Sequence, residues 1–118
     1  MKEHNQVIAA AESAANENPV DAELQVNLGM AYFHAQRLDE ALGAFQRAIA
    51  LKPDTATAYN GIGRVRYHTG PAEEAIAAYE QAIALDPHYI DPAYGLGILY
   101  SAQLGDYARA VAAFQRGL

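Results

Sequence analysis

The feature that most constrains the fold is a repeat of 34 residues that runs through the chain. The same interval separates three prolines and three glycines, which are Pro19, Pro53, Pro87, Gly29, Gly63 and Gly97. When residues 22–55 are aligned with residues 56–89, 11 of the 34 positions are identical. Self-similarity at a fixed period of about 20–50 residues is typical of proteins in which each unit packs against the next. The sequence therefore predicts an array of similar units.

Each unit carries the pattern of two helices. Apolar residues recur every three or four positions, which is the spacing of one face of a helix. In the second half of the first unit this stripe consists of Ala41, Leu42, Phe45, Ala48 and Ile49. Alanine, the strongest helix former, accounts for 26 of the 118 residues. Gly70 and Gly105 suit the left-handed conformation at the end of a helix. An all-α fold of helix–turn–helix units is therefore predicted.

This pattern resembles the tetratricopeptide repeat family. The resemblance rests on residues 22–32, AELQVNLGMAY, for the first helix of a unit, and on DEAL at 39–42 and AIALKP at 48–53 for the second. It implies a right-handed α-solenoid of about seven helices, with Gly29, Gly63 and Gly97 letting paired helices approach closely. The expected division of a single domain over 1–118 is an N-terminal helix resembling a second helix at 3–17 and repeats at 22–55, 56–89 and 90–118.

Two departures from the family pattern stand out. The first turn has Gln36-Arg37 where the family prefers Gly-Asp, and the third repeat is truncated. Its last helix, expected at 107–117, carries Val111, Phe114 and Leu118 with no polar helix after it. Solenoids usually end in a polar capping element. Either the natural protein continues beyond this point, or a partner covers this face.

Composition and charge exclude several classes of function. Eight Lys and Arg residues against 14 Asp and Glu residues give a net charge of −6, which opposes general binding to nucleic acid. The absence of cysteine excludes disulfides, a thiolate nucleophile and a cysteine-based zinc site. No apolar run approaches the roughly 20 residues that span a bilayer. We expect a cytoplasmic protein with neither nucleic acid nor membrane as a partner.

No segment has the pattern of an active site. The sequences GIG at 61–63 and GLG at 95–97 lack the third glycine of a dinucleotide-binding loop and lie within expected helices. His34 and His68 occupy the same repeat position, so together they are a conceivable metal pair. No cysteine or cluster of carboxylates accompanies them, which favours two solvated histidines. We therefore expect no enzyme activity, no cofactor and no metal.

The resemblance implies that the first helices of the units line a concave groove, where the family commonly binds peptides or helices of partner proteins. Carried over position by position, the predicted groove residues are Val26, Asn27, Met30, Phe33, His34, Asn60, Arg64, Tyr67, His68, Tyr94, Ile98 and Ser101. Gly61 and Gly95 are expected to let a ligand backbone come close. Aromatic residues, Met and Arg are enriched at binding hot spots.

Arg64 allows two interpretations. It either receives a carboxylate of a partner or pairs with Glu23 or Asp91 across the groove. The leading prediction for the chain is a scaffold that binds a protein or peptide partner in the groove. The alternatives are a structural unit that assembles head to tail into a homo-oligomer through its last helix, and a regulatory array excised from a larger protein.

Overall fold

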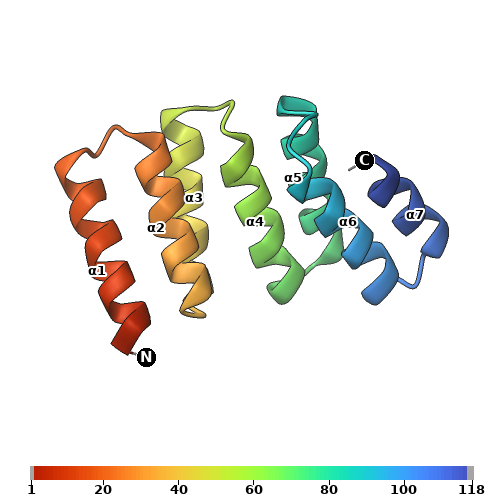
Figure 1. The fold of residues 1–118 in the computed structure, drawn as a ribbon, viewed down its shortest axis with the longest axis horizontal. Coiled ribbons are helices and arrows are strands. Elements are labelled where there is room, and N and C mark those ends of the chain that lie inside the picture. Colours follow the sequence, from red (N-terminus) through yellow and green to blue (C-terminus); the bar gives the residue numbers. More distant parts are fainter. Residues whose placement is uncertain (1, 117–118) are drawn as a thin grey trace.

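The computed structural model describes residues 2–116, which form seven α-helices and no strand (Figure 1). The helices are α1 (Lys2–Glu17), α2 (Ala22–His34), α3 (Leu38–Leu51), α4 (Ala56–Thr69), α5 (Ala72–Leu85), α6 (Asp91–Ala102) and α7 (Tyr107–Arg116). This confirms the predicted all-α fold. Leu118, which the sequence places on the apolar face of the last helix, lies outside the described residues. No helix within 2–116 is long and apolar enough to cross a lipid bilayer.

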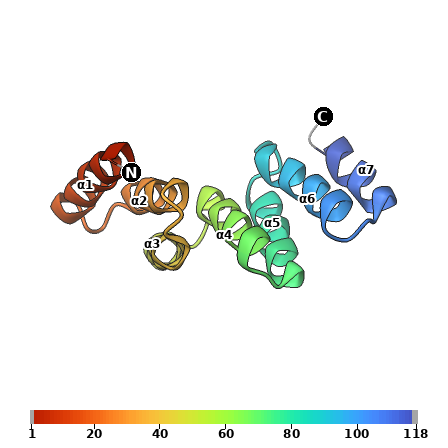
Figure 2. The ribbon, with the colours of Figure 1, turned by 90° about the horizontal axis from the view of Figure 1, so that it is seen from below.

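The helices form antiparallel pairs that stack in chain order. The pairs α2–α3, α4–α5 and α6–α7 make the closest packing, and α2, α4 and α6 also contact one another in succession. The result is an elongated solenoid with extents of 45 × 30 × 23 Å. In Figure 2, α3 lies below α2 whereas α7 lies to the right of α6, so successive pairs are rotated relative to one another.

Close packing of the pairs depends on an aromatic ring set against glycine. Phe45 of α3 is fully buried and lies against Gly29 of its own unit and Gly61 of the next. A β-carbon built at Gly29 would lie 2.6 Å from Cε1 of Phe45, far inside van der Waals contact. A side chain larger than hydrogen would therefore push α2 away from α3.

The same arrangement recurs along the chain. The buried ring of Tyr79 in α5 lies between Gly63 and Gly95, where built β-carbons would fall 2.6 Å and 2.7 Å from ring atoms. In the last unit the ring of Phe114 lies against Gly97. The predicted close approach at Gly29, Gly63 and Gly97 is thus confirmed, and each ring also joins one unit to the next where a next unit is present.

The N-terminal helix packs on the first unit as a further layer. Ile8 and Ala15 are buried against the core of that unit, whereas Val7 is exposed. The hydroxyl of Tyr32 in α2 donates a hydrogen bond of 2.5 Å to Oε2 of Glu12. Burial of Tyr32, together with this carboxylate, raises the pKa of its hydroxyl to about 12. The helix α1 is therefore tied to α2 by both apolar and polar contacts.

The turns within the units share a positive backbone φ angle. Gly70 and Gly105 have φ angles of 74° and 62°, as their position at helix ends predicts, although the ψ angle of Gly70 is 175°, outside the left-handed helical region. Gln36, at the same place in the first unit, has a φ of 66° although it carries a β-carbon. The fold thus imposes the left-handed conformation on a residue that adopts it at a steric cost.

Replacing Gln36 by glycine is expected to raise the free energy of unfolding by about 1 kcal/mol, because glycine adopts a positive φ without that cost. Urea unfolding followed by circular dichroism measures the change. The matched control is Gln46→Gly in the exposed interior of α3, which should lower the free energy of unfolding by about 1 kcal/mol. A loss of stability for Gln36→Gly equal to that of the control would contradict the backbone assignment.

Candidate functional site

A groove with a volume of about 1200 Å³ opens between α4, α6 and α7. The sequence folds this way because the first helices of successive units stand side by side and each second helix packs behind them. The residues that line the groove are Phe33, Asn60, Arg64, Tyr67, His68, Tyr79, Ile90, Asp91, Tyr94, Gly95, Ile98, Val111, Phe114 and Gln115. Most of these side chains are apolar or aromatic, which is typical of a ligand-binding surface.

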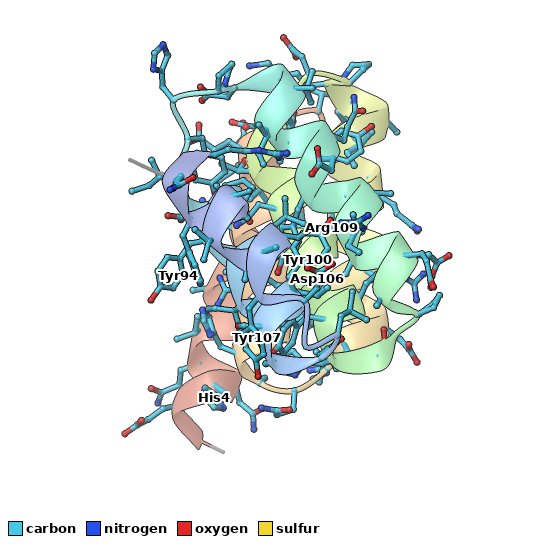
Figure 3. The ribbon with its side chains drawn as sticks, turned by 90° about the vertical axis from the view of Figure 1, so that its right-hand side faces the viewer. His4, Tyr94, Tyr100, Asp106, Tyr107 and Arg109 are labelled. Atoms are coloured by element: carbon cyan, nitrogen blue, oxygen red, sulfur yellow. The ribbon has the colours of Figure 1, made fainter. Side chains whose placement is uncertain are left out.

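One wall of the groove is apolar and comes from α6 and α7. We call this the α6–α7 wall; it consists of Tyr94, Ile98, Val111 and Phe114. The rings of Tyr94 and Phe114 meet edge to face, with 5.3 Å between their centroids. Tyr94 is 63% exposed and projects away from the helices in Figure 3. The wall therefore presents large apolar side chains that no described residue covers.

The opposite side of the groove centres on Arg64 of α4. Its guanidinium carbon lies 4.7 Å from the centroid of the Phe33 ring, which is a cation–π contact. The ring of His68 lies 5.7 Å from Phe33 and 5.3 Å from Tyr67. Arg64 is half-buried, so its side chain is held in place by the aromatic groups around it.

Arg64 forms no salt bridge within residues 2–116. The four ion pairs in that range use Arg37, Arg66, Arg109 and Arg116. The alternative that Arg64 pairs with Glu23 or Asp91 is therefore wrong. Arg64 instead lies over the ring of Phe33 in the neighbouring helix α2 and lines the groove.

A polar contact ties the groove residue Asn60 to the α5–α6 loop. Asn60 is only 5% exposed, and its Nδ2 donates a 3.1 Å hydrogen bond to the hydroxyl of Tyr89. Burial is the main cause that raises the pKa of the Tyr89 hydroxyl, with the nearby carboxylate of Asp91 acting in the same direction. Burial also raises the pKa of Tyr79 to about 12. These tyrosines are neutral at physiological pH, and Arg64 and Asp91 are the arginine and the carboxylate among the residues that line the groove.

The structure brings seven of the twelve predicted groove residues together. They are Phe33, Asn60, Arg64, Tyr67, His68, Tyr94 and Ile98. Phe33 belongs to α2, and the others belong to α4 and α6. The groove is therefore formed mainly by the second and third units rather than by the whole length of the solenoid.

The other five predicted residues do not line the groove. Val26 is 7% exposed and belongs to the core of the first unit, against which Met30 also packs. Asn27 and His34 are exposed but lie outside the groove. Ser101 turns its hydroxyl back to donate a 3.0 Å hydrogen bond to the carbonyl oxygen of Gly97. A side chain used for packing or for its own helix does not reach a ligand.

Gly61 also differs from expectation. It is buried beneath the ring of Phe45 and does not line the groove, so it gives no room for a ligand backbone. Gly95 does line the groove, beside the ring of Tyr79. The two glycines occupy the same repeat position and both lie against the buried ring of the preceding unit, but Gly61 is buried whereas Gly95 is partly exposed.

Five groove residues are not among the predicted first-helix positions. They are Tyr79, Ile90, Val111, Phe114 and Gln115. A signal for Phe114 was present in the sequence, because it occupies the repeat position of the buried rings Phe45 and Tyr79. No later unit within the described residues covers Phe114, so this ring contributes to the groove instead.

Within residues 2–116 no group of three or more His, Asp or Glu side chains is placed to hold a metal ion.

Comparison with known proteins identifies the family. The model described as Tetratricopeptide repeat matches residues 20–88 and, in an overlapping register, residues 54–118. The chain belongs to the tetratricopeptide repeat family. This membership agrees with the stacked helix pairs and with the glycine–aromatic packing, and it makes the chain a protein-interaction scaffold in general terms.

Solved structures of similar fold support this assignment. Two structures described as crystal structures of MamA superpose on this tetratricopeptide repeat chain with TM-scores of 0.82 and 0.81, each at 32% sequence identity. The alignments cover 97% and 98% of this chain but only 66% and 62% of the matched chains. The chain therefore spans less than two thirds of the length of those proteins. Comparison with curated proteins gives no match.

Proposed function

We propose that this tetratricopeptide repeat chain holds a peptide segment or helix of a partner protein in the groove, as a scaffold without catalytic activity. The observation that carries the proposal is the exposed apolar surface that lines the groove. Four of the nine large hydrophobic residues that are exposed line it, namely Ile90, Tyr94, Ile98 and Val111. Exposed apolar surface gathered in one region marks an interaction site.

The chemistry of the groove supports a protein ligand. The α6–α7 wall offers large apolar contacts, and Arg64 and Tyr67 add two of the residue types that dominate binding energy at protein interfaces. Asn60 is held by Tyr89, and among the residues that line the groove no nucleophile stands beside a base, which favours binding over chemistry. A cytoplasmic location stays a prediction from the sequence.

Substitutions in the groove are expected to abolish partner capture. Arg64→Glu and Tyr67→Ala should each reduce the amount of partner recovered from native lysate by about tenfold or more, since loss of a central hot-spot residue has an effect of this size. Quantitative mass spectrometry of the captured proteins measures the effect, and circular dichroism checks that the helices are retained.

Arg109→Glu is the matched control for this experiment. Arg109 lies on α7 outside the groove, is 71% exposed and pairs with Asp106 of its own helix start. The control makes the same change of charge as Arg64→Glu and should leave capture unchanged. Recovery of the same partners by both groove variants at the wild-type level would show that the groove is not the binding site.

A second candidate function is self-assembly. Tyr107 and Val111 are exposed one helical turn apart on α7, and Leu104 is exposed in the turn before it. At the other end, α1 exposes Val7. A head-to-tail contact between these ends would bury apolar side chains of both and repeat from copy to copy.

Sedimentation velocity over a concentration series tests this second candidate. Self-assembly predicts a sedimentation coefficient that rises with protein concentration, and Tyr107→Asp should suppress the rise because it places a charge in the apolar contact. A single monomeric boundary at all concentrations would exclude assembly through α7.

A further inference from the structure

We infer that the partner segment carries one internal acidic residue, flanked on both sides by large apolar residues, and that its carboxylate pairs with Arg64. The inference rests on the proposed function, since it describes the ligand of the same groove. Three features of the groove carry it: an arginine without a carboxylate partner, the distribution of charge, and apolar surfaces on both sides of that arginine.

The first feature is the arginine itself. Arg64 is half-buried and fixed over the ring of Phe33 at 4.7 Å, and it forms no salt bridge within the described residues. A cation–π contact with a ring uses no N–H donor of the guanidinium for a carboxylate, so the donors of Arg64 can still bind one in a bidentate manner. Because the side chain is already ordered by Phe33, binding loses little further conformational entropy.

The second feature is the charge around the site. The chain has a net charge of −6, so an acidic ligand is disfavoured over most of its surface. Arg64 is the one permanently charged cation among the groove residues, and Asp91, at the first residue of α6, is the one carboxylate. A ligand with a run of acids would meet Asp91 with like charge. A single acidic residue opposite Arg64 fits this distribution.

The third feature is the apolar surface on both sides of Arg64. Phe33 of α2 lies on one side of α4, and the α6–α7 wall lies on the other, because α2 and α6 pack against α4 from opposite sides (Figure 1). A ligand whose chain ends in its carboxylate at Arg64 would leave one of these surfaces exposed to water. A ligand that continues past its acidic residue covers both, and burial of apolar area favours this arrangement by roughly 25 cal/mol per Å².

Peptide selection on the protein tests the inference and does not require that the natural partner be identified. The probe is a phage library of random 12-residue peptides with linkers at both ends, so that no peptide offers a free C-terminal carboxylate. A second library displays the peptides with a free C-terminus. Wild-type protein should enrich sequences from the first library in which one Asp or Glu stands between aromatic or aliphatic residues.

Matched variants identify the source of any acidic preference. Arg64→Gln should enrich peptides without that preference, whereas Arg109→Gln should enrich the same acidic sequences as wild type. For the best selected peptide, Asp→Asn or Glu→Gln should weaken binding to wild type by about tenfold or more, as expected for a charge-assisted pair. The same exchange should change binding to Arg64→Gln by less than about twofold, because the two groups act as one pair.

The outcomes separate this inference from the proposed function. Tyr67→Ala serves to show which peptides bind in the groove. Selected peptides that lose binding to Tyr67→Ala but show no acidic preference would overturn the inference and leave the groove as a peptide site. Enrichment only from the library with a free C-terminus would overturn the inference that the acidic residue lies within the segment. Selected peptides that bind Tyr67→Ala with the same affinity as wild type would overturn both the inference and the proposed function. The absence of any enrichment would do the same.

Discussion

Phe45→Ala is expected to lower the free energy of unfolding by about 3–5 kcal/mol, the range for truncating a fully buried phenylalanine. The ring of Phe45 has no exposed surface and lies against Gly29 and Gly61, which belong to two successive units. Its loss leaves a cavity at the junction between the units as well as within the first one. Urea unfolding followed by circular dichroism measures the effect.

Phe114→Ala is the matched control for this prediction. Phe114 occupies the same repeat position and lies against Gly97, but it is partly exposed on the groove. The loss of stability should therefore be about half that of Phe45→Ala. If Phe45→Ala fails to fold, Phe45→Leu gives a smaller loss that can still be measured. A loss for Phe45→Ala no greater than that for Phe114→Ala would contradict the role of this ring in joining units.

Addition of a single methyl group at two helical glycines is expected to change stability in opposite directions. Gly61→Ala should lower the free energy of unfolding by about 1–3 kcal/mol, because the new β-carbon would overlap the buried ring of Phe45. Gly43→Ala should raise it by about 0.5–1 kcal/mol, because the nearest atom there is Nη1 of Arg47 at 3.6 Å and alanine favours the helix.

Each variant is the control for the other, since both glycines lie inside helices and both changes add the same atoms. Thermal and urea unfolding of the two proteins, side by side with wild type, give the sign and size of each effect. Stabilisation by both substitutions would show that α4 can move away from Phe45 at little cost, which would contradict the tight packing between the first two units.

The sequence predicted most of the fold because contacts in a repeat protein are local. The phase of the glycines and of the apolar stripes predicted seven helices and the close approach at Gly29, Gly63 and Gly97. The turn at Gln36 shows the strength of this constraint, since the positive φ persists there without glycine. Local propensity alone would not place a glutamine in that conformation.

The groove was predicted less completely, because a repeat position defines a side chain's direction only when its neighbours are the same in each unit. Val26, Asn60 and Tyr94 occupy one repeat position. The structure buries Val26 in the core, holds Asn60 against Tyr89, and leaves Tyr94 63% exposed. These differences come from the side chains that surround each helix, and a 34-residue pattern does not specify them.

The groove residues of α7 were also not predicted from the repeat pattern. Val111 and Phe114 belong to a second helix, so carrying over positions from first helices does not select them. They line the groove because no described unit packs over them. Their apolar character is visible in the sequence, whereas the surface they face follows only from the rotation between successive helix pairs.

Site-specific crosslinking tests the central claim, that a partner segment lies in the groove, most directly. The chain has no cysteine, so Gln115→Cys and Ala84→Cys each allow a photoreactive label at one position. Residue 115 lines the groove, and residue 84 lies on the exposed surface of α5 outside it. We predict that the captured partner crosslinks from position 115 and not from position 84. Equal crosslinking from both positions, or crosslinking from position 84 alone, would contradict the account.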